Sequence, residues 1–231
     1  MPLDRVTAAL LVGTMTSVLA VAGTGAAAAA EPGTAPNQAV APAADALAEW
    51  AEETSDAVGV PERALLACAA ADLALREEEP GCGLSWSTLA GIGRVESNHG
   101  RFGGARLDDE ARARPEIVGL PLDGSPGIAL IVDTDGGELD GDTELDRAVG
   151  PMQFIPGTWA QWRSDGDGDD VRDPHDLDDA ALAAARYLCA GDRDLTTGDG
   201  WWAALHSYNR SVEYGQRVYE ITNAISERAD R

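Results

Sequence analysis

The feature that most constrains the fold is an amphipathic segment that ends in a glutamate. Between Leu84 and Glu96, the residues Leu89, Ile92, Gly93 and Glu96 are spaced i, i+3, i+4 and i+7. On a helix these four positions share one face, and the apolar members indicate that this face is buried. The sequence therefore predicts a helix over about 85–98 that carries the Glu96 carboxyl group towards the interior of a helical domain.

Burial has a chemical consequence for Glu96. A carboxyl group without a charged partner loses hydration, which disfavours its ionised form and raises its pKa towards neutrality. Such a group can hold a proton and donate it to a leaving oxygen. Gly100 suits a C-terminal helix cap, so Glu96 is expected in the last turn, near a loop and solvent. Glu96 is the candidate catalytic acid.

Two other interpretations apply to this helix end. Glu96 could form a structural salt bridge with Arg94 or Arg101, but Arg94 is only two residues away and faces elsewhere on a helix. His99 could be the catalytic group instead. Histidines at helix ends commonly cap the helix or face solvent, and no Ser/His/Asp arrangement accompanies His99, which favours Glu96.

Helical patterns dominate the rest of the chain. We expect helices over 44–57, 61–78, 178–190, 200–208 and 213–228, and a loop over 148–159 that leads into a short helix. Two β-rich runs, 116–120 and 127–132, are separated by a Pro/Gly turn and predict a small hairpin. The predicted fold class is mainly α, or α+β with a single β-hairpin excursion.

The N-terminal segment has the pattern of an export signal. Arg5 precedes an apolar run from Ala8 to Ala22, and small residues, Ala28 to Ala30, come before Glu31. The run is short for a membrane span, which needs about 20 mainly apolar residues. We expect residues 1–30 to be a cleaved signal peptide of a secreted protein; an uncleaved membrane anchor is the alternative. Residues 31–43 are interpreted as a flexible linker and 44–80 as an N-terminal helical segment.

The charge balance limits the partners. Seventeen basic and 40 acidic residues give a formal net charge of −23. Such a chain repels polyanions, so nucleic acid is excluded as an expected partner. We expect a monomer.

Export permits disulfide bonds, and three cysteines are present. Cys82 lies in a turn ahead of the Glu96 helix and Cys189 ends an alanine-rich helix. Their pairing would close a loop of 107 positions, for which chain entropy predicts about 4–5 kcal/mol of stabilisation. Cys68 lies in an apolar helix and is expected to be a buried, inert thiol.

Two acidic loops are candidate calcium sites. In the first, carboxylates occupy positions 1, 3, 5, 9 and 12 of an EF-hand-like frame: Asp165, Asp167, Asp169, Asp173 and Asp176. Position 6 is Asp170 instead of glycine, and position 12 is Asp instead of Glu. The alternative is a solvated acidic turn in which Asp176 or Asp178 caps the next helix. The second loop, 133–144, matches only positions 1, 3 and 12.

Four motifs occur in the order typical of one enzyme family. They are Glu96-Ser97-Asn98-His99-Gly100, then Gly150-Pro151-Met152-Gln153-Phe154-Ile155-Pro156 with Thr158-Trp159, then Ala185-Arg186-Tyr187-Leu188, then Ser207-Tyr208-Asn209. Over roughly residues 82–225 the chain resembles soluble lytic transglycosylases, and in particular the membrane-bound lytic transglycosylase B branch in its secreted actinobacterial form.

The resemblance implies a lysozyme-like, mainly α domain over 81–231 that cleaves the β-1,4 bond between N-acetylmuramic acid and N-acetylglucosamine in peptidoglycan. It implies that one glutamate, Glu96, acts as acid and then as base while the muramoyl 6-hydroxyl attacks, with a 1,6-anhydro product and no cofactor in the chemistry. The implied substrate-binding residues are Ser97, Asn98, Met152, Gln153, Phe154, Tyr187, Tyr208 and Asn209. Taken alone, Gln153 could equally bond backbone, and Tyr187 and Tyr208 could be core residues.

The chain departs from the family pattern at 102–146, where an acidic hairpin is inserted between Glu96 and the Gly150 loop. Two other functions therefore stay open. A hydrolytic muramidase on the same fold would use a second carboxylate such as Glu144, Asp146 or Asp142 to activate water. A calcium-dependent wall-binding module would have no catalytic activity.

Overall fold

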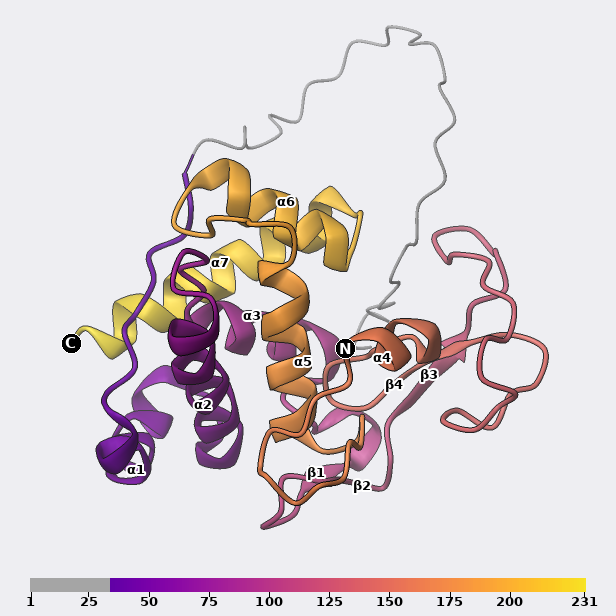
Figure 1. The fold of residues 1–231 in the computed structure, drawn as a ribbon, viewed down its shortest axis with the longest axis horizontal. Coiled ribbons are helices and arrows are strands. Elements are labelled where there is room, and N and C mark those ends of the chain that lie inside the picture. The colour runs from indigo at the N-terminus through magenta and orange to yellow at the C-terminus, as the bar shows by residue number, and fades with distance from the viewer. Residues whose placement is uncertain (1–33) are drawn as a thin grey trace, which may run out of the picture.

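Helix α3, Trp86–Ser97, lies at the centre of the helical part of the chain and packs against α2, α5 and α7. The computed structural model describes residues 34–231. Figure 1 shows most of the helices together on the left and the long loops that connect the short strands on the right, with one short helix beside these strands. Within the described residues, seven α-helices and four short strands confirm the predicted mainly α fold with a small β part.

The helices follow the predicted ranges closely. A 3-10 turn, η1 (Ala44–Ala46), leads into α1 (Leu47–Val58), and then come α2 (Glu62–Glu78) and α3. After the strands follow α4 (Pro156–Trp162), α5 (Leu177–Cys189), α6 (Gly198–Tyr208) and α7 (Val212–Ala229). Helix α2 packs along α5, whose buried face is built from alanines such as Ala180, Ala183 and Ala184. Their small side chains let the two helices approach closely.

Helices α3 and α7 are in similarly close contact at Gly91. A Cβ atom at Gly91 would lie 3.3 Å from the carbonyl oxygen of Val218 and would overlap the hydroxyl of Thr222. Only glycine therefore fits at this crossing. Almost one turn earlier on α3, Trp201 of α6 donates from Nε1 to Thr88 Oγ1 at 3.1 Å. These contacts fix α3 against both C-terminal helices.

The β part differs from the predicted hairpin in its pairing. Strand β1 (Arg106–Leu107) pairs with β2 (Ala113–Arg114), and β3 (Val118–Pro121) pairs with β4 (Arg147–Val149), both antiparallel. The run 127–132, predicted as the partner of 116–120, forms no strand. It folds back on 122–124 through a tight turn, with Ile131 N donating to the oxygen of Leu122. The pairing was wrong because both apolar runs suit a strand, and only tertiary contacts choose the partner.

Residues 34–43 lie against the helices instead of forming a free linker. The Gln38 amide donates to the oxygen of Leu195 at 2.8 Å, Ser226 Oγ donates to the oxygen of Asn37 at 2.8 Å, and Ala39 and Ala41 are buried. The expectation of a flexible linker therefore does not describe this part. Residues of α1, α2 and the later helices also share one hydrophobic cluster, so 44–80 is integrated with the rest.

The predicted disulfide between Cys82 and Cys189 is present. Cys68 is a buried free thiol whose pKa burial raises to about 12, as expected for an inert group. Residues 1–30, interpreted as a signal peptide, lie outside the described residues. Among the residues that are described, no helix has the length and apolar character needed to span a bilayer.

Candidate active site

Glu96 lies in the last turn of α3, as predicted, and its side chain is buried. Ser85 begins the helix by accepting a hydrogen bond from Ser87 N. Asn98, and not Gly100 as predicted, ends it in the left-handed conformation with φ 55°. Glu96 is 6% exposed. The expectation that it lies near a loop is correct, but the carboxyl group does not reach solvent.

The Glu96 carboxyl group has one partner. Tyr214, in the first turn of α7, donates from its hydroxyl to Glu96 Oε1 at 2.6 Å. The other oxygen, Oε2, is buried and has no hydrogen-bond partner among the described residues. Neither arginine considered above forms an ion pair with Glu96 in this part of the chain. The structural salt bridge is therefore not formed.

Burial controls the protonation of Glu96. Desolvation raises its pKa to about 8, and the hydrogen bond from Tyr214 acts in the opposite direction but more weakly. At neutral pH the carboxyl group is therefore predominantly protonated, and Oε2 is the oxygen free to carry the proton. Tyr214 stays a phenol, because burial and then the charge of Glu96 raise its pKa well above the usual value. Glu96 is therefore a neutral acid whose Oε1 accepts a hydrogen bond from the Tyr214 hydroxyl and whose Oε2 is free to carry the proton.

The helix end is tied to the Gly150 loop by Ser97. Ser97 Oγ donates to the oxygen of Pro151 at 2.6 Å and accepts from Gly100 N at 2.7 Å. The loop itself packs closely: a Cβ at Gly150, where φ is 76°, would overlap the carbonyl oxygen of Pro174. The first two sequence motifs thus meet in space. Asn98 is half-buried at the cap.

The third and fourth motifs join the same cluster. Tyr208, at the end of α6, donates from its hydroxyl to the oxygen of Met152 at 2.8 Å. Its ring lies 6.1 Å from that of Phe154 and 5.8 Å from that of Tyr187, centroid to centroid. Burial raises the pKa of Tyr208, and the charge of Glu96 is the second cause, so the two groups are neighbours. All four motifs therefore converge around the end of α3.

Most of the residues carried over as substrate-binding are buried here. Met152, Phe154 and Tyr208 are at most 1% exposed, and Gln153 and Asn209 are at most 5% exposed. The Gln153 amide donates to the oxygen of Gly150 at 3.0 Å, and Asn209 Oδ1 accepts from Ser211 N at 2.9 Å. These side chains hold their own loops in this structure. The half-buried Tyr187 donates to the oxygen of Ser207 at 2.5 Å.

His99 is not suited to proton transfer at neutral pH. It is 2% exposed, and burial followed by the charges of Arg101 and Arg94 lowers its pKa to about 3. A Cβ at Gly93 would lie 3.5 Å from His99 Nδ1, so the ring packs against α3 as a neutral group. Glu96 holds a proton at neutral pH and His99 does not, and this difference assigns the role of the acid to Glu96.

Tyr214 is the residue that sequence reasoning missed. It lies outside the four motifs, six positions after Tyr208, and nothing in the local pattern indicates its partner. Ser211 caps α7 by accepting from Tyr214 N at 3.2 Å, which places the tyrosine in the first turn. The available signal is the tyrosine in the first turn of a helix that follows directly on the last motif.

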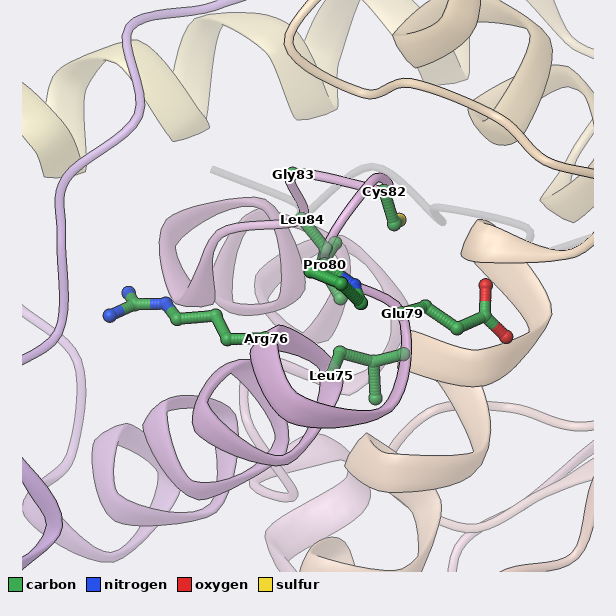
Figure 2. A pocket seen from close by; sticks show the side chains of 7 residues that line it. All are labelled: Leu75, Arg76, Glu79, Pro80, Cys82, Gly83 and Leu84. Carbon is green, nitrogen blue, oxygen red and sulfur yellow. The ribbon is translucent and has the colours of Figure 1, made fainter.

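The hollows in the surface lie elsewhere. One, of about 80 Å³, is formed where α2 turns into α3. Figure 2 shows Arg76 and Glu79 extending from it in opposite directions, with Pro80, Cys82 and Leu84 between them. A smaller one is lined by alanines of α2 with Asp178 and Leu182. Neither of these two hollows contains Glu96, whose free oxygen is itself buried.

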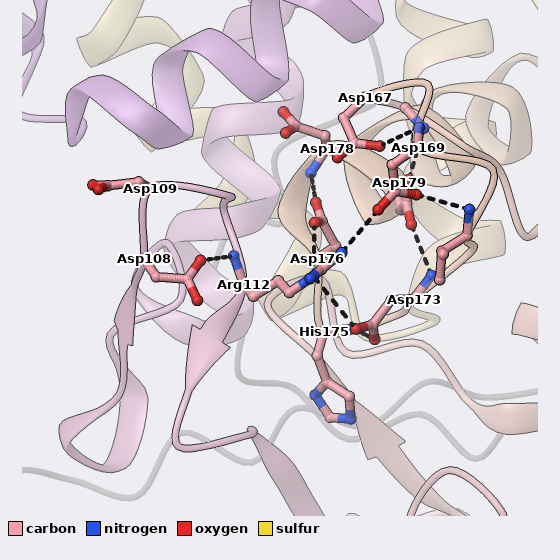
Figure 3. Close-up of polar contacts among 12 residues, drawn as sticks. Asp108, Asp109, Arg112, Asp167, Asp169, Asp173, His175, Asp176, Asp178 and Asp179 are labelled. Atoms are coloured by element: carbon pink, nitrogen blue, oxygen red, sulfur yellow. Dashed lines mark hydrogen bonds and ion pairs between the residues drawn. The ribbon is translucent and has the colours of Figure 1, made fainter.

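The first acidic loop is divided between a cluster and an arginine (Figure 3). Oxygen atoms of Asp165, Asp167 and Asp179 lie within 4.8 Å of one another. The other three expected ligands contact Arg112: Asp169 at 2.9 Å, Asp176 at 3.5 Å and Asp173 at 3.9 Å. The frame of five ligands is therefore not assembled.

Asp176 is a helix cap, which was the alternative to its role as a calcium ligand. It caps α5 by accepting from Asp178 N at 2.9 Å, and burial raises its pKa to about 7. Asp179, which sequence reasoning missed, accepts from Gly166 N and from Asp173 N, both at 2.7 Å, and burial raises its pKa to about 6. It faces the loop because it lies in the first turn of α5.

The second acidic loop also forms a cluster, of Asp133, Asp135 and Asp146. Asp146 is fully buried and accepts from both the backbone and the hydroxyl of Thr134, at 2.8 and 2.7 Å. Asp142 pairs with Arg147 at 2.9 Å. Two of the three carboxylates named as water-activating candidates, Asp142 and Asp146, thus hold the loop, and the third, Glu144, is exposed.

Comparisons with known proteins give a distant likeness only. No protein-family model and no curated protein matches the sequence. Among solved structures, the Escherichia coli lytic transglycosylase Slt35 in complex with bulgecin A is 14% identical, with a TM-score of 0.45, over 88% of this chain and 82% of that chain. Slt35 in complex with calcium and a 36 kDa muramidase/transglycosylase have the same identity and TM-score. At this level the likeness does not assign an activity.

Proposed function

We propose that this chain cleaves peptidoglycan as an exported lytic transglycosylase with a lysozyme-like fold, and that Glu96 is its single acid/base. The observation that carries the proposal is the state of the Glu96 carboxyl group. It is buried, protonated at neutral pH, held by Tyr214 through one oxygen and free at the other. The four sequence motifs that resemble the family meet around it.

In the proposed reaction Glu96 Oε2 gives its proton to the glycosidic oxygen, and the bond from C1 of the muramoyl residue to that oxygen breaks. The resulting carboxylate then takes the proton of the muramoyl 6-hydroxyl while O6 forms a bond to C1. Glu96 is restored and no water is consumed. Tyr214 stabilises the carboxylate between the two steps, because a hydrogen bond to a charged acceptor is stronger than one to a neutral group.

The proposal requires that substrate reaches the covered oxygen. Glu96 Oε2 is shielded here, and residues of the Gly150 loop and of 208–214 surround the end of α3. Substrate binding therefore has to displace some of these surrounding residues. Gln153 and Asn209 would then exchange their present backbone partners for substrate. Exclusion of water around the acid also favours internal attack by the 6-hydroxyl over hydrolysis.

The hydrolytic muramidase is the second candidate. It needs a carboxylate free to activate water. Asp142 and Asp146 are both engaged, with Arg147 and Thr134, which favours the single-carboxylate reaction. Glu144 is the exposed member of the three and is the one that the rival function would use.

Calcium and export complete the proposal. Asp165, Asp167 and Asp179 supply carboxylate oxygens of the kind that calcium prefers, and the ion would act on structure and not in the reaction. A calcium-dependent wall-binding module would keep this carboxylate cluster and would have no catalytic activity. Export is supported by the signal-like pattern of residues 1–30 and by the disulfide between Cys82 and Cys189. The proposed partner is the glycan strand of the cell wall.

The direct test is the release of soluble fragments from purified peptidoglycan by Glu96→Gln. This substitution keeps an acceptor for Tyr214 and removes the transferable proton, so the rate should fall by about 10²–10⁴. Glu227→Gln, an exposed position on the same α7 helix as Tyr214, is the matched control and should keep the wild-type rate. Full activity of Glu96→Gln rejects the assignment, and wall binding without cleavage by the wild type supports the binding module.

A further inference from the structure

The positive charges of this acidic chain are distributed unevenly. All 17 basic residues are arginines. Several are neutralised by carboxylates, among them Arg63, Arg76, Arg112, Arg147 and Arg186. Three others near the end of α3 form no ion pair within the described residues: Arg94, Arg101 and Arg106. Other described arginines, such as Arg163 and Arg217, also form no ion pair, so the notable feature of these three is that they lie together near Glu96 in a chain of net charge −23.

Local geometry brings the three arginines together. Arg101 is held against the cap of α3, donating from Nε to the oxygen of Asn98 at 3.0 Å and from Nη2 to Asn98 Oδ1 at 3.2 Å. Strand β1 lies directly on this helix end, since a Cβ at Gly100 would lie 3.0 Å from Leu107 Cγ. Arg106, the neighbour of Leu107 in this strand, is near enough for its charge to act on Arg101.

The guanidinium groups of Arg94 and Arg106 are both close enough to act on that of Arg101. Partial burial, and then the charges of Arg94 and Arg106, lower the pKa of Arg101. Arg106 also lies directly opposite Arg114 across the β1–β2 pair, an arrangement of like charges that costs stability. Arg114 is compensated by Asp108 and Glu116, whereas Arg106 is not. All three arginines are exposed.

We propose that Arg94, Arg101 and Arg106 form an anion-binding surface, here called the arginine surface, that binds carboxylates of the peptide carried by the glycan strand. The inference rests on the proposed function, because it places the peptide beside the bond that Glu96 protonates. Arg101 is five residues after Glu96 and bonded to the cap of the same helix. A substrate whose sugar lies at Glu96 brings its peptide substituent to this side of the molecule.

The physical advantage is electrostatic. A chain with this net charge repels a polyanionic wall, and a local positive surface beside the acid concentrates anionic substrate where it reacts. Arginine forks bind carboxylates in two parallel hydrogen bonds, so they also orient the peptide. The arginine surface would thereby distinguish strands with peptides from strands without them.

The test compares two substrates, peptidoglycan freed of teichoic acids and the same glycan with its peptides removed by an amidase. In the double variant Arg101→Gln/Arg106→Gln, KM for the peptide-bearing glycan should rise about threefold to tenfold, with kcat little changed. KM for the peptide-free glycan should stay within about twofold. Arg101→Lys with Arg106 intact keeps the charge but loses the forked guanidinium group. Its KM for the peptide-bearing glycan should lie between those of the double variant and the wild type.

The matched control is Arg231→Gln, two residues beyond the end of α7; from Tyr214 to that end the helix runs about 22 Å along its axis. It removes one exposed positive charge and should not change KM for the peptide-bearing or the peptide-free glycan. The wild-type preference for peptide-bearing glycan should also decrease as salt rises, because exposed ion pairs are screened. Equal effects of Arg231→Gln and the double variant would mean that only net charge matters, which overturns the proposal.

A binding arm separates the two proposals. The Glu96→Gln protein is sedimented with each glycan, with and without the double substitution. Loss of binding to peptide-bearing glycan alone supports the arginine surface even if the wild type proves inactive, in which case only the transglycosylase function fails. Equal binding by both proteins rejects the arginine surface and leaves the catalytic proposal intact. If the double substitution weakens binding only to walls that retain teichoic acids, the ligand is phosphate, and the proposal that the arginine surface binds peptide carboxylates is rejected.

Discussion

The hydroxyl of Tyr214 donates to Oε1 of Glu96 at 2.6 Å, across 118 positions of sequence. The contact joins the last turn of α3 to the first turn of α7, two helices that pack together along Gly91 and Thr222. It leaves the second carboxyl oxygen free and sets the direction in which the proton can leave.

Replacing Tyr214 by Phe should slow the reaction. The variant loses the hydrogen bond that stabilises the Glu96 carboxylate, which is worth about 1.5–3 kcal/mol for a charged acceptor, or about tenfold to a hundredfold in rate. Because this bond lowers the pKa of Glu96, its loss should also move the alkaline limit of activity to higher pH. The measurement is kcat against pH for both proteins.

The matched control for that prediction is Tyr219→Phe. Tyr219 lies on the same helix, stacks on Trp202 with ring centroids 5.9 Å apart, and its hydroxyl makes no hydrogen bond among the described residues. It should keep the wild-type pH profile. An unchanged profile in Tyr214→Phe would show that Tyr214 does not act on the acid.

Glu96→Gln should be more stable than the wild type at alkaline pH. The pKa of Glu96 is about 8 in the folded protein and near 4.5 in an unfolded chain, so the folded state binds more protons between these values. Stability of the wild type therefore falls as pH rises from about 4.5 to 8, by up to a few kcal/mol at about 1.4 kcal/mol per pH unit. The glutamine variant lacks this loss, and the difference in Tm should grow from pH 5 to pH 8. A constant difference contradicts the raised pKa.

Gly91→Val should destabilise the fold by about 1–3 kcal/mol, since the added side chain overlaps Thr222 and pushes α3 away from α7. The same displacement should separate Tyr214 from Glu96 and reduce activity in the protein that remains folded. Urea unfolding measures the first effect. Gly81→Val is the control, because a Cβ at Gly81 meets nothing within 4 Å; equal losses in both variants would mean that the crossing is not tight.

Calcium should raise Tm, and a chelator should reverse the rise. At a free concentration of 100 Kd the gain is about 2.7 kcal/mol. Asp167→Asn should reduce the response, because Asp167 belongs to the cluster with Asp165 and Asp179. Asp170→Asn, an exposed neighbour outside the cluster, should keep it. If Asp135→Asn removes the response while Asp167→Asn does not, the ion belongs to the other loop, and no response in the wild type rejects calcium.

Local sequence patterns predicted the helices and the disulfide well. The Glu96 helix shows why: its apolar spacing and its cap at Ser85 are each set by residues that lie within a few positions of one another. The strand partner of 118–121 was wrong because β4 lies beyond an insertion whose path depends on tertiary contacts. Residues 34–43 are rich in alanine and proline, and nothing local indicates that they pack on α7 and on the loop before α6.

The site was predictable in its acid and not in its surroundings. Periodicity alone buries Glu96, but its partner Tyr214 and the loop ligand Asp179 come from helices whose positions the sequence does not specify. Arg112 was missed for the same reason: it reaches the acidic loop from the edge of β2. A carboxylate pattern along a loop does not reveal a cation supplied from elsewhere in the chain.

The most direct test of the central claim is mass spectrometry of the fragments that the wild type releases from purified peptidoglycan. If buried Glu96 acts alone as acid and base, the muramoyl ends should be 1,6-anhydro forms, one water lighter than hydrolysed ends, and Glu96→Gln should release none. Hydrolysed ends from the wild type, or undiminished release by Glu96→Gln, would contradict the account.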